Sequence, residues 1–251
     1  MNMYNPFSLS NKTILITGAS SGIGAATAIE CSKMGASVII TGRNEGRLND
    51  VFNRLDTSIA QSHQLFIADL SNHDDVCHLV DHTNKIDGLV NNAGISKIKP
   101  VAFLKQEDFD TVFQSNIFSH ACLIQQLLKK KKLQKGASIV FLSSVSAFYN
   151  APGRSLYASS KAALTSFMRS CAVELADKSI RSNAIHPGIV ETKMILENLT
   201  EEERQKDMEN YPLKRHGKPE EIAWAIIYLL SDASEWVTGT SLTIDGGFML
   251  K

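Results

Sequence analysis

The sequence lacks the features that mark membrane-spanning, secreted or broadly nucleic-acid-binding proteins. Its 26 Lys and Arg residues balance 26 Asp and Glu residues, so the formal net charge is zero and no broad basic surface for nucleic acid is expected. No apolar run reaches the roughly 20 residues that cross a membrane. The first residues, Met1–Pro6, contain no basic start followed by an apolar stretch, so no signal peptide is expected there.

Cysteine is scarce, and no segment has the composition of a linker. The four cysteines are far apart in the sequence and form no metal-ligand pattern, so we expect buried free thiols in a reducing cytosol and no metal site. No Pro/Gly/Ser-rich stretch, repeat or low-complexity tract divides the 251 residues. We therefore expect a single domain over residues 1–251, with enough apolar material for one core.

Short apolar runs alternate with helical patterns along the chain. The runs at 13–16, 37–41, 64–68, 87–90, 139–142, 181–185 and 241–244 are typical of buried strands. Apolar residues at helical spacing fill 107–132 and the segment after Tyr157, and Pro219 opens another helix. This alternation predicts an α/β fold with a parallel sheet flanked by helices.

Three residues in the second half of the chain can carry acid–base chemistry. Tyr157 and Lys161 are four residues apart, which on a helix places their side chains on one face. Ser144 follows the run 139–142 and so lies near the carboxyl end of a strand, where open parallel sheets bind ligands. A hydroxyl, a phenol and an ammonium group together can transfer a proton to or from a carbonyl or alcohol. We expect the ammonium charge to lower the pKa of Tyr157; the alternative is an ordinary exposed pair.

A glycine-rich turn follows the first predicted strand and opens a helix. Gly18, Gly22 and Gly24 give the spacing G-x-x-x-G-x-G. Such a corner lets the backbone approach a pyrophosphate, while the helix N-terminus supplies N–H groups and the positive end of its dipole. At the end of the second strand, Gly42 and Arg43 stand where an acid would favour NAD. Arginine suits a 2′-phosphate, so we expect NADP(H), with NAD(H) as the alternative.

Ser144, the Tyr157-x-x-x-Lys161 pair and this glycine spacing resemble the short-chain dehydrogenase/reductase family, over about residues 9–248. The resemblance implies a single-domain, Rossmann-like, doubly wound parallel sheet of seven strands. It implies that Tyr157 is the acid or base, that Lys161 holds the nicotinamide ribose, that Ser144 polarises the carbonyl, and that Asn116 completes a proton relay through a water. It also implies a homotetramer in the cytoplasm and a structural role for His186.

The resemblance further implies a set of cofactor contacts and a mobile lid over 194–212. The implied contacts are Gly18, Ser20, Ser21, Gly22, Ile23, Gly24, Arg43, Asp69, Leu70, Asn91, Ala93, Gly94, Tyr157, Lys161, Pro187, Gly188, Ile189 and Thr192.

Two lysines bear on the substrate class. The chain resembles bacterial 3-oxoacyl-acyl-carrier-protein reductases, in which two basic residues near the mouth of the site hold the acidic carrier; the matching positions here are Lys135 and Lys178. The alternatives are a sugar, polyol, steroid or xenobiotic carbonyl dehydrogenase of the same family, and a non-catalytic NADP-sensing module. The intact Ser144, Tyr157, Lys161 and Asn116 set argues against the sensor.

Overall fold

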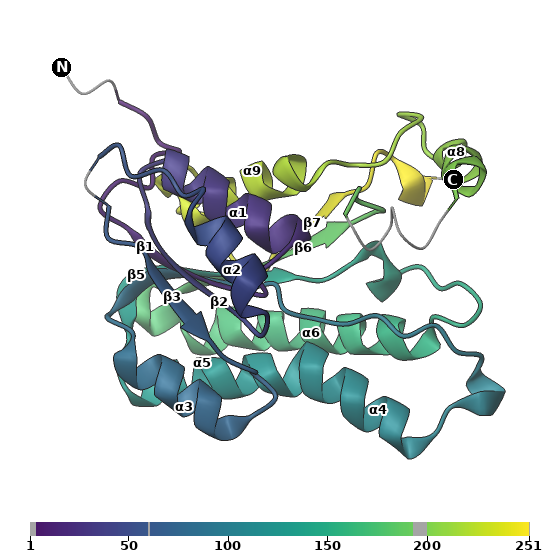
Figure 1. The fold of residues 1–251 in the computed structure, drawn as a ribbon, viewed down its shortest axis with the longest axis horizontal. Helices are drawn as coiled ribbons and strands as arrows, with labels where there is room; N and C mark the ends of the chain where they lie inside the picture. The colour runs from purple at the N-terminus through teal and green to yellow at the C-terminus, as the bar shows by residue number, and fades with distance from the viewer. Residues whose placement is uncertain (1–3, 60, 193–199, 251) are drawn as a thin grey trace.

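The strands form one parallel sheet of seven strands in the order β3-β2-β1-β4-β5-β6-β7 (Figure 1). The computed structural model describes residues 4–59, 61–192 and 200–250. The strands are β1 Thr13–Thr17, β2 Ser37–Gly42, β3 Gln64–Ile67, β4 Ile86–Asn91, β5 Leu133–Leu142, β6 Arg181–Pro187 and β7 Ser241–Ile244. The predicted α/β class and the seven-stranded parallel sheet are thus confirmed.

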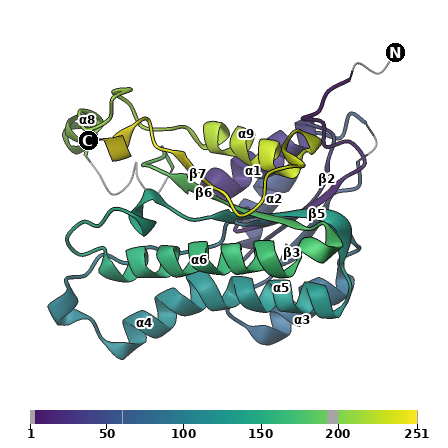
Figure 2. The same cartoon turned by 180° about the vertical axis from the view of Figure 1, so that it is seen from behind.

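Helices cover both faces of the sheet (Figures 1 and 2). One face carries α1 Gly22–Lys33, α2 Glu45–Phe52 and α9 Pro219–Leu230, and the other carries α3 His73–His82, α4 Gln106–Phe113, α5 Ser119–Lys129 and α6 Ser155–Glu174. The short helix α8, Glu201–Met208, lies apart from both layers, and the Thr200 and Glu203 side chains cap its N-terminus reciprocally. Of the predicted lid, residues 194–199 lie outside the described part of the chain.

Two apolar cores separate the sheet from its helices. Within β1, Ile14 and Ile16 pack into the core that includes α1 and α9, whereas Leu15 between them packs into the core that includes α3, α5 and α6. Successive side chains of a strand point to opposite faces, so a strand that is covered on both faces reads as an unbroken apolar run. This is why the central strands were visible in the sequence.

The largest differences from the predicted elements concern β5 and the helix predicted over 107–132, whereas other strand ends shift by one or two residues. Strand β5 starts at Leu133 rather than Ile139, because its first residues, Leu133–Ala137, include polar residues and a register shift against β4. The helix predicted over 107–132 is α4 and α5 joined by a π-helical turn, η2 Gln114–Phe118. Such a turn inserts an extra residue into the helix, and it occurs often at functional sites.

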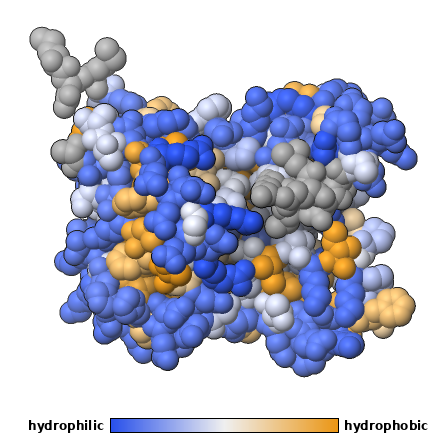
Figure 3. Space-filling view, in the orientation of Figure 1, coloured by the Kyte–Doolittle hydropathy of each residue, from blue (hydrophilic) through white to orange (hydrophobic). Residues whose placement is uncertain are grey.

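The described residues also show the character of the surface and the state of the cysteines. Within the described ranges, no helix is both long and apolar enough to cross a membrane. In the same part of the chain, no group of three or more His, Cys, Asp or Glu side chains is arranged to hold a metal ion. The four cysteines are free thiols, but only Cys31 and Cys171 are buried as expected, whereas Cys77 and Cys122 on α3 and α5 are partly exposed. Polar residues dominate the face seen in Figure 3, with apolar patches on its lower half.

Candidate active site

Ser144, Tyr157 and Lys161 meet beyond the carboxyl end of β5. Ser144 follows that strand, and its side chain caps a short 3₁₀ turn by accepting a hydrogen bond from the Ser146 N–H at 3.1 Å. Tyr157 and Lys161 lie on the first turns of α6, and the Lys161 Nζ lies 5.8 Å from the centre of the Tyr157 ring. The buried Lys161 ammonium donates to the Leu142 carbonyl at 2.6 Å, which fixes it at the end of β5. The predicted grouping of these three residues is therefore present in the fold.

The acid–base balance of these groups differs from the expectation in one respect. Burial raises the pKa of the Tyr157 phenol, while hydrogen bonding to Ser144 and the nearby Arg154 charge act in the opposite sense. Burial also lowers the pKa of Lys161 to about 8. The predicted net lowering of the Tyr157 pKa by Lys161 is therefore wrong for the protein alone, because the low-dielectric surroundings disfavour both charged forms.

Asn116 lies in the π-helical turn and clamps the loop after β4 to α6. Its Oδ1 accepts from the Ile95 N–H at 2.8 Å, and its Nδ2 donates to the Ile95 carbonyl at 3.0 Å and to the Ser160 Oγ at 2.9 Å. A Cβ added to Gly94 would lie 3.1 Å from the Asn116 Oδ1 and 3.5 Å from the Lys161 Nζ, so these three residues are neighbours. Because the Asn116 amide is already engaged by the protein, a water relay from Asn116 would need its main-chain carbonyl.

The glycine turn is tied to the end of β4 by an asparagine that the sequence analysis did not single out. Asn92 donates from its Nδ2 to the carbonyls of Thr17 and Gly18 at 2.9 and 3.0 Å. Gly18 has φ +62°, and a Cβ there would lie 2.9 Å from the Ala93 Cα, so only glycine fits. The expected contact residue Asn91 is instead fully buried, and both of its polar side-chain atoms have no partner within the described residues.

These features fit a dinucleotide. An unpaired buried amide such as that of Asn91 needs a hydrogen-bond partner, and a cofactor at the carboxyl edge of the sheet would provide one. No side chain caps the N-terminus of α1 at Ser21, so its N–H groups are available to a pyrophosphate.

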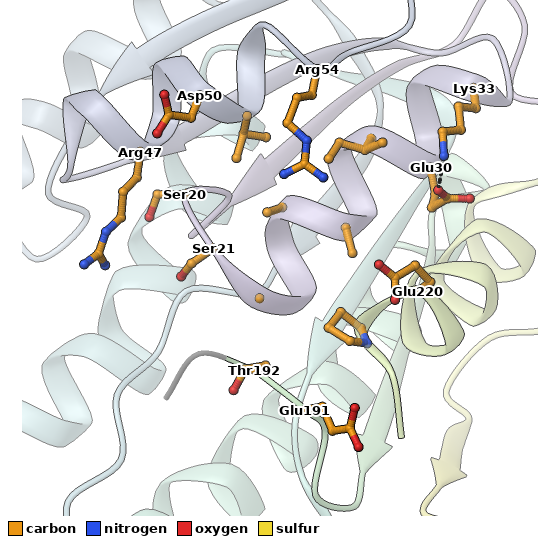
Figure 4. A pocket seen from close by; sticks show the side chains of 16 residues that line it. Ser20, Ser21, Glu30, Lys33, Arg47, Asp50, Arg54, Glu191, Thr192 and Glu220 are labelled. Carbon is orange, nitrogen blue, oxygen red and sulfur yellow. Dashed lines mark hydrogen bonds and ion pairs between the residues drawn. The ribbon is translucent and has the colours of Figure 1, made fainter. Parts of the chain in front are cut away.

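A cavity of about 480 Å³ opens beside the N-terminus of α1 (Figure 4). Its lining includes four of the predicted cofactor contacts, namely Ser20, Ser21, Gly22 and Thr192. It also includes Arg47 of α2, a cation that the sequence analysis missed and that Figure 4 shows beside the two serines. Ser144, Tyr157 and Lys161 do not line this cavity.

Arg43, the residue expected to select the cofactor, lies at the surface. Its side chain is 68% exposed and forms a loose ion pair with Asp69, in which Nη1 and Oδ2 are 3.8 Å apart. Asp69 uses its other carboxylate oxygen, Oδ1, to accept from the Ser71 N–H, and Leu70 beside it is buried. Arg43 and Asp69 thus flank the ends of β2 and β3, at the same sheet edge as the glycine turn.

The loop after β6 brings its predicted residues to this edge as well. The predicted structural residue His186 is buried and donates from Nδ1 to the Ser144 carbonyl at 3.0 Å, which holds the serine loop in place. The Gly188 N–H donates to the Ile244 carbonyl, and a Cβ on Gly188 would lie 3.0 Å from the Asp245 Cα. Ile189 donates from its N–H to the hydroxyl of Tyr211, a buried residue that the sequence analysis did not identify.

Lys135 and Lys178 lie far from Ser144, Tyr157 and Lys161. Lys135 is near the start of β5, and Lys178 ends the turn that precedes β6, so both are at the amino edge of the sheet. The six residue-to-residue steps from Ser138 to Ser144 alone correspond to ~20 Å of extended chain. The expectation that these two lysines lie at the mouth of the site is not met within one chain.

Comparisons with known proteins agree with this geometry. The family model described as enoyl-(acyl carrier protein) reductase matches residues 18–249. The 3-oxoacyl-(acyl-carrier-protein) reductase of Rickettsia prowazekii is 34% identical over 242 residues, covering 96% of this chain and 98% of that protein. The L-rhamnose 1-dehydrogenase (NAD(P)(+)) of Azotobacter vinelandii is also 34% identical, covering 97% of this chain and 98% of that protein.

A solved structure shares the whole fold. The 7α-hydroxysteroid dehydrogenase complexed with NADH and 7-oxoglycochenodeoxycholic acid superimposes with a TM-score of 0.91 at 33% identity, covering 98% of both chains. The chain therefore belongs to the short-chain dehydrogenase/reductase family of NAD(P)(H)-binding oxidoreductases, which act on alcohol and carbonyl groups.

Proposed function

We propose that this protein is an NADP(H)-dependent ketoreductase that converts the ketone of a 3-oxoacyl compound into a secondary alcohol. The observation that carries the proposal is the meeting of Ser144, Tyr157 and Lys161 at the sheet edge where α1 begins. Its similarity to a 3-oxoacyl-(acyl-carrier-protein) reductase over nearly the whole chain supports the substrate class. When bound, the cofactor supplies the hydride.

The protein's own groups handle the substrate oxygen and the proton. Ser144 donates a hydrogen bond to the ketone oxygen, and Tyr157 donates the proton that completes the alcohol. Lys161, held by the Leu142 carbonyl, binds the nicotinamide ribose and keeps a cation near the phenol. In the reverse direction Tyr157 accepts the proton, helped by the positive charge of the oxidised nicotinamide.

The cofactor preference in this proposal rests on the basic residues around the glycine turn. Arg43 at the end of β2, with Arg47 and Ser20 nearby, can surround a 2′-phosphate with charge-assisted hydrogen bonds. No carboxylate occupies position 42, where one would repel that phosphate. Purified protein assayed with one ketone should therefore give a higher kcat/KM with NADPH than with NADH.

Oxidation of a sugar or polyol is the second candidate, because the L-rhamnose dehydrogenase relative matches the chain as fully as the reductase does. We would assay an acetoacetyl thioester and methyl acetoacetate in reduction, and L-rhamnose and a polyol in oxidation, with both cofactors. A larger kcat/KM for the 3-oxoacyl compounds supports the proposal. Preference for the sugar would select the second candidate, and cofactor binding without any turnover would favour the sensing module.

We also propose that the protein works in the cytoplasm as a homotetramer. An acyl carrier protein is not required by the proposal, since Lys135 and Lys178 lie at the other edge of the sheet.

A further inference from the structure

Arg154 lies immediately before α6, the helix that carries Tyr157 and Lys161. It is the N-cap residue of α6, three positions before Tyr157, so both side chains leave the same side of the first helical turn. Arg154 is partly buried. The loop before it is held by a hydrogen bond from the Lys99 N–H to the Gly153 carbonyl at 2.8 Å. The backbone that carries this cation is therefore held within one helical turn of Tyr157.

The guanidinium of Arg154 makes no ion pair and no side-chain hydrogen bond to any residue that the structure describes, although its main-chain N–H bonds to the Ala151 carbonyl. The lysines of the neighbouring loop, unlike Arg154, have carboxylate partners. Lys97 and Lys99 both form ion pairs with the buried carboxylate of Asp108. Partly buried arginines usually have partners, because taking the charge out of water is costly.

The charge of Arg154 also acts on two phenols that belong to different parts of the site. Burial raises the pKa of both Tyr157 and Tyr211, and Arg154 opposes that effect at each of them. Tyr211 lies beside the loop after β6, where its hydroxyl accepts from the Ile189 N–H at 3.3 Å. Its ring centre is 5.1 Å from that of Phe248, so two aromatic rings pack together at this part of the site.

The carboxylates near Tyr211 are already hydrogen-bonded to other groups. Asp207 bonds to the Nε2 of the buried His216 at 2.8 Å. Asp245 accepts from the N–H groups of Gly247 and Met249, each at 2.9 Å. Neither is paired with Arg154.

We propose that Arg154 binds an anionic group of the substrate, so that the preferred ketones carry a carboxylate or a phosphate a few bonds from the carbonyl. The inference rests on the proposed ketoreductase function; it selects free anionic 3-oxo acids within the 3-oxoacyl class, and it admits phosphorylated ketones outside that class. A guanidinium fork matches the paired oxygens of either group, and the partly buried position strengthens the attraction. Ser144 and Tyr157 would then hold the ketone while Arg154 fixes the other end of the substrate.

Matched pairs of ketones test this inference in the full-length protein with saturating NADPH. Acetoacetate is compared with methyl acetoacetate, and dihydroxyacetone phosphate with dihydroxyacetone, for the wild type and for Arg154→Gln. We expect the variant to lose roughly 10- to 100-fold in kcat/KM for an anionic ketone, the usual range for a hydrogen-bonded charge, and to keep its rate with the neutral one. The pair that responds identifies the anion as carboxylate or phosphate.

Two further variants separate charge from structure. Arg154→Lys should recover part of the lost rate, and Arg169→Gln, which removes an exposed cation farther along the same helix, should change neither substrate. Equal losses on anionic and neutral ketones, or no preference for anions in the wild type, would overturn the inference while leaving the ketoreductase proposal standing.

A binding measurement covers the case in which no ketone is turned over. Calorimetric titration of acetoacetate, and of dihydroxyacetone phosphate, into the NADP⁺ complex should show binding that Arg154→Gln weakens by a similar factor. Absence of this difference for both anions would reject the anion site independently of catalysis, and absence of turnover with every ketone would reject the ketoreductase proposal alone.

Discussion

Tyr157 is the residue on which the proposed chemistry depends most. Tyr157→Phe removes the hydroxyl that would move the proton but leaves the ring, so turnover should fall to background while the Kd for NADPH stays within about twofold. Ser144→Ala should lower kcat by roughly a hundredfold, as removal of one oxyanion donor does. Steady-state kinetics and fluorescence titration of NADPH check both variants. Near-normal turnover in Tyr157→Phe would reject the mechanism.

Arg43 and its neighbour Gly42 control the choice of cofactor in our proposal. A Cβ on Gly42 would lie 3.5 Å from the Ser20 side chain, an ordinary contact, so Gly42→Asp can be accommodated. Together with Arg43→Ala it removes an attraction to the 2′-phosphate and adds a repulsion, and preference should shift from NADPH to NADH, mainly through KM. The ratio of kcat/KM for the two cofactors decides this. A wild type that already prefers NADH would show that Arg43 serves only its ion pair with Asp69.

His120 should make the protein sensitive to acid. It is fully buried and donates from Nε2 to the Ala93 carbonyl, and burial lowers its pKa to about 3. Between that value and the ordinary pKa of about 6.5 the unfolded chain binds the extra proton and the native state does not, so stability falls as pH drops through this window. From pH 7 to 4.5 the contribution lost is on the order of 2 kcal/mol.

Denaturant unfolding of His120→Gln at these two pH values measures that contribution. The variant should lose less stability on acidification than the wild type. His82→Gln, at an exposed site on α3, serves as the control and should follow the wild type. Identical pH dependence in all three proteins would contradict the assignment.

At the residue scale, spacing predicted the groups that lie close together in sequence or in the sheet. Tyr157 and Lys161 share a helix face, and Ser144 follows a strand, so periodicity alone brought them together. Arg154 and Asn92 were missed because an arginine and an asparagine in loops read as solvated or turn residues. The pKa direction of Tyr157 was wrong because burial cannot be read from residue types.

The π-helical turn between α4 and α5 is the element whose geometry the site needs most. Asn116 within it makes three hydrogen bonds to Ile95 and Ser160. Asn116→Leu should leave the buried polar groups of these partners unpaired, which costs about 1–3 kcal/mol for each group. We expect a lower Tm and a much lower kcat, with the Kd for NADPH less affected. Asn116→Asp, which keeps the acceptor, should recover part of the stability; a wild-type Tm in Asn116→Leu would refute the clamp.

At the element scale, continuous apolar runs predicted strands because the sheet is covered on both faces. The same reasoning could not find the polar start of β5 or the π-helical turn. A single extra residue in a helix barely changes the apolar pattern, and its position depends on what Asn116 binds in the folded protein.

At the scale of the whole molecule, exposed apolar side chains bear on the oligomeric state. Trp236 is fully exposed and Trp224 is 56% exposed on the α9 side, while Phe118 is 54% exposed on the opposite helical layer. Two separate apolar faces suit a tetramer built from two kinds of interface. Light scattering at micromolar concentration should give four chain masses.

Substitution at one face should break one interface only. Phe118→Glu is expected to yield dimers, because a charge on that face opposes its burial. Ile59→Glu, at an exposed loop position, is the matched control and should remain a tetramer. A monomeric wild type would contradict the proposed assembly.

The position of β1 in the middle of the sheet has a consequence for how such genes can recombine. Strands β2 and β3, with the residues that we propose select the coenzyme, lie on one side of β1, and β4 to β7, with the residues that we propose transfer the proton, lie on the other. A crossover in the segment between β3 and β4 would exchange coenzyme choice without touching Ser144 or Tyr157. The seam of such a hybrid comprises the pairing of β1 with β4, the apolar core shared by α1 and α9, and the contact of Asn92 with the Thr17 and Gly18 carbonyls and the Thr17 hydroxyl. The two parents must therefore match in the side chains of that core as well as keep this threonine and asparagine.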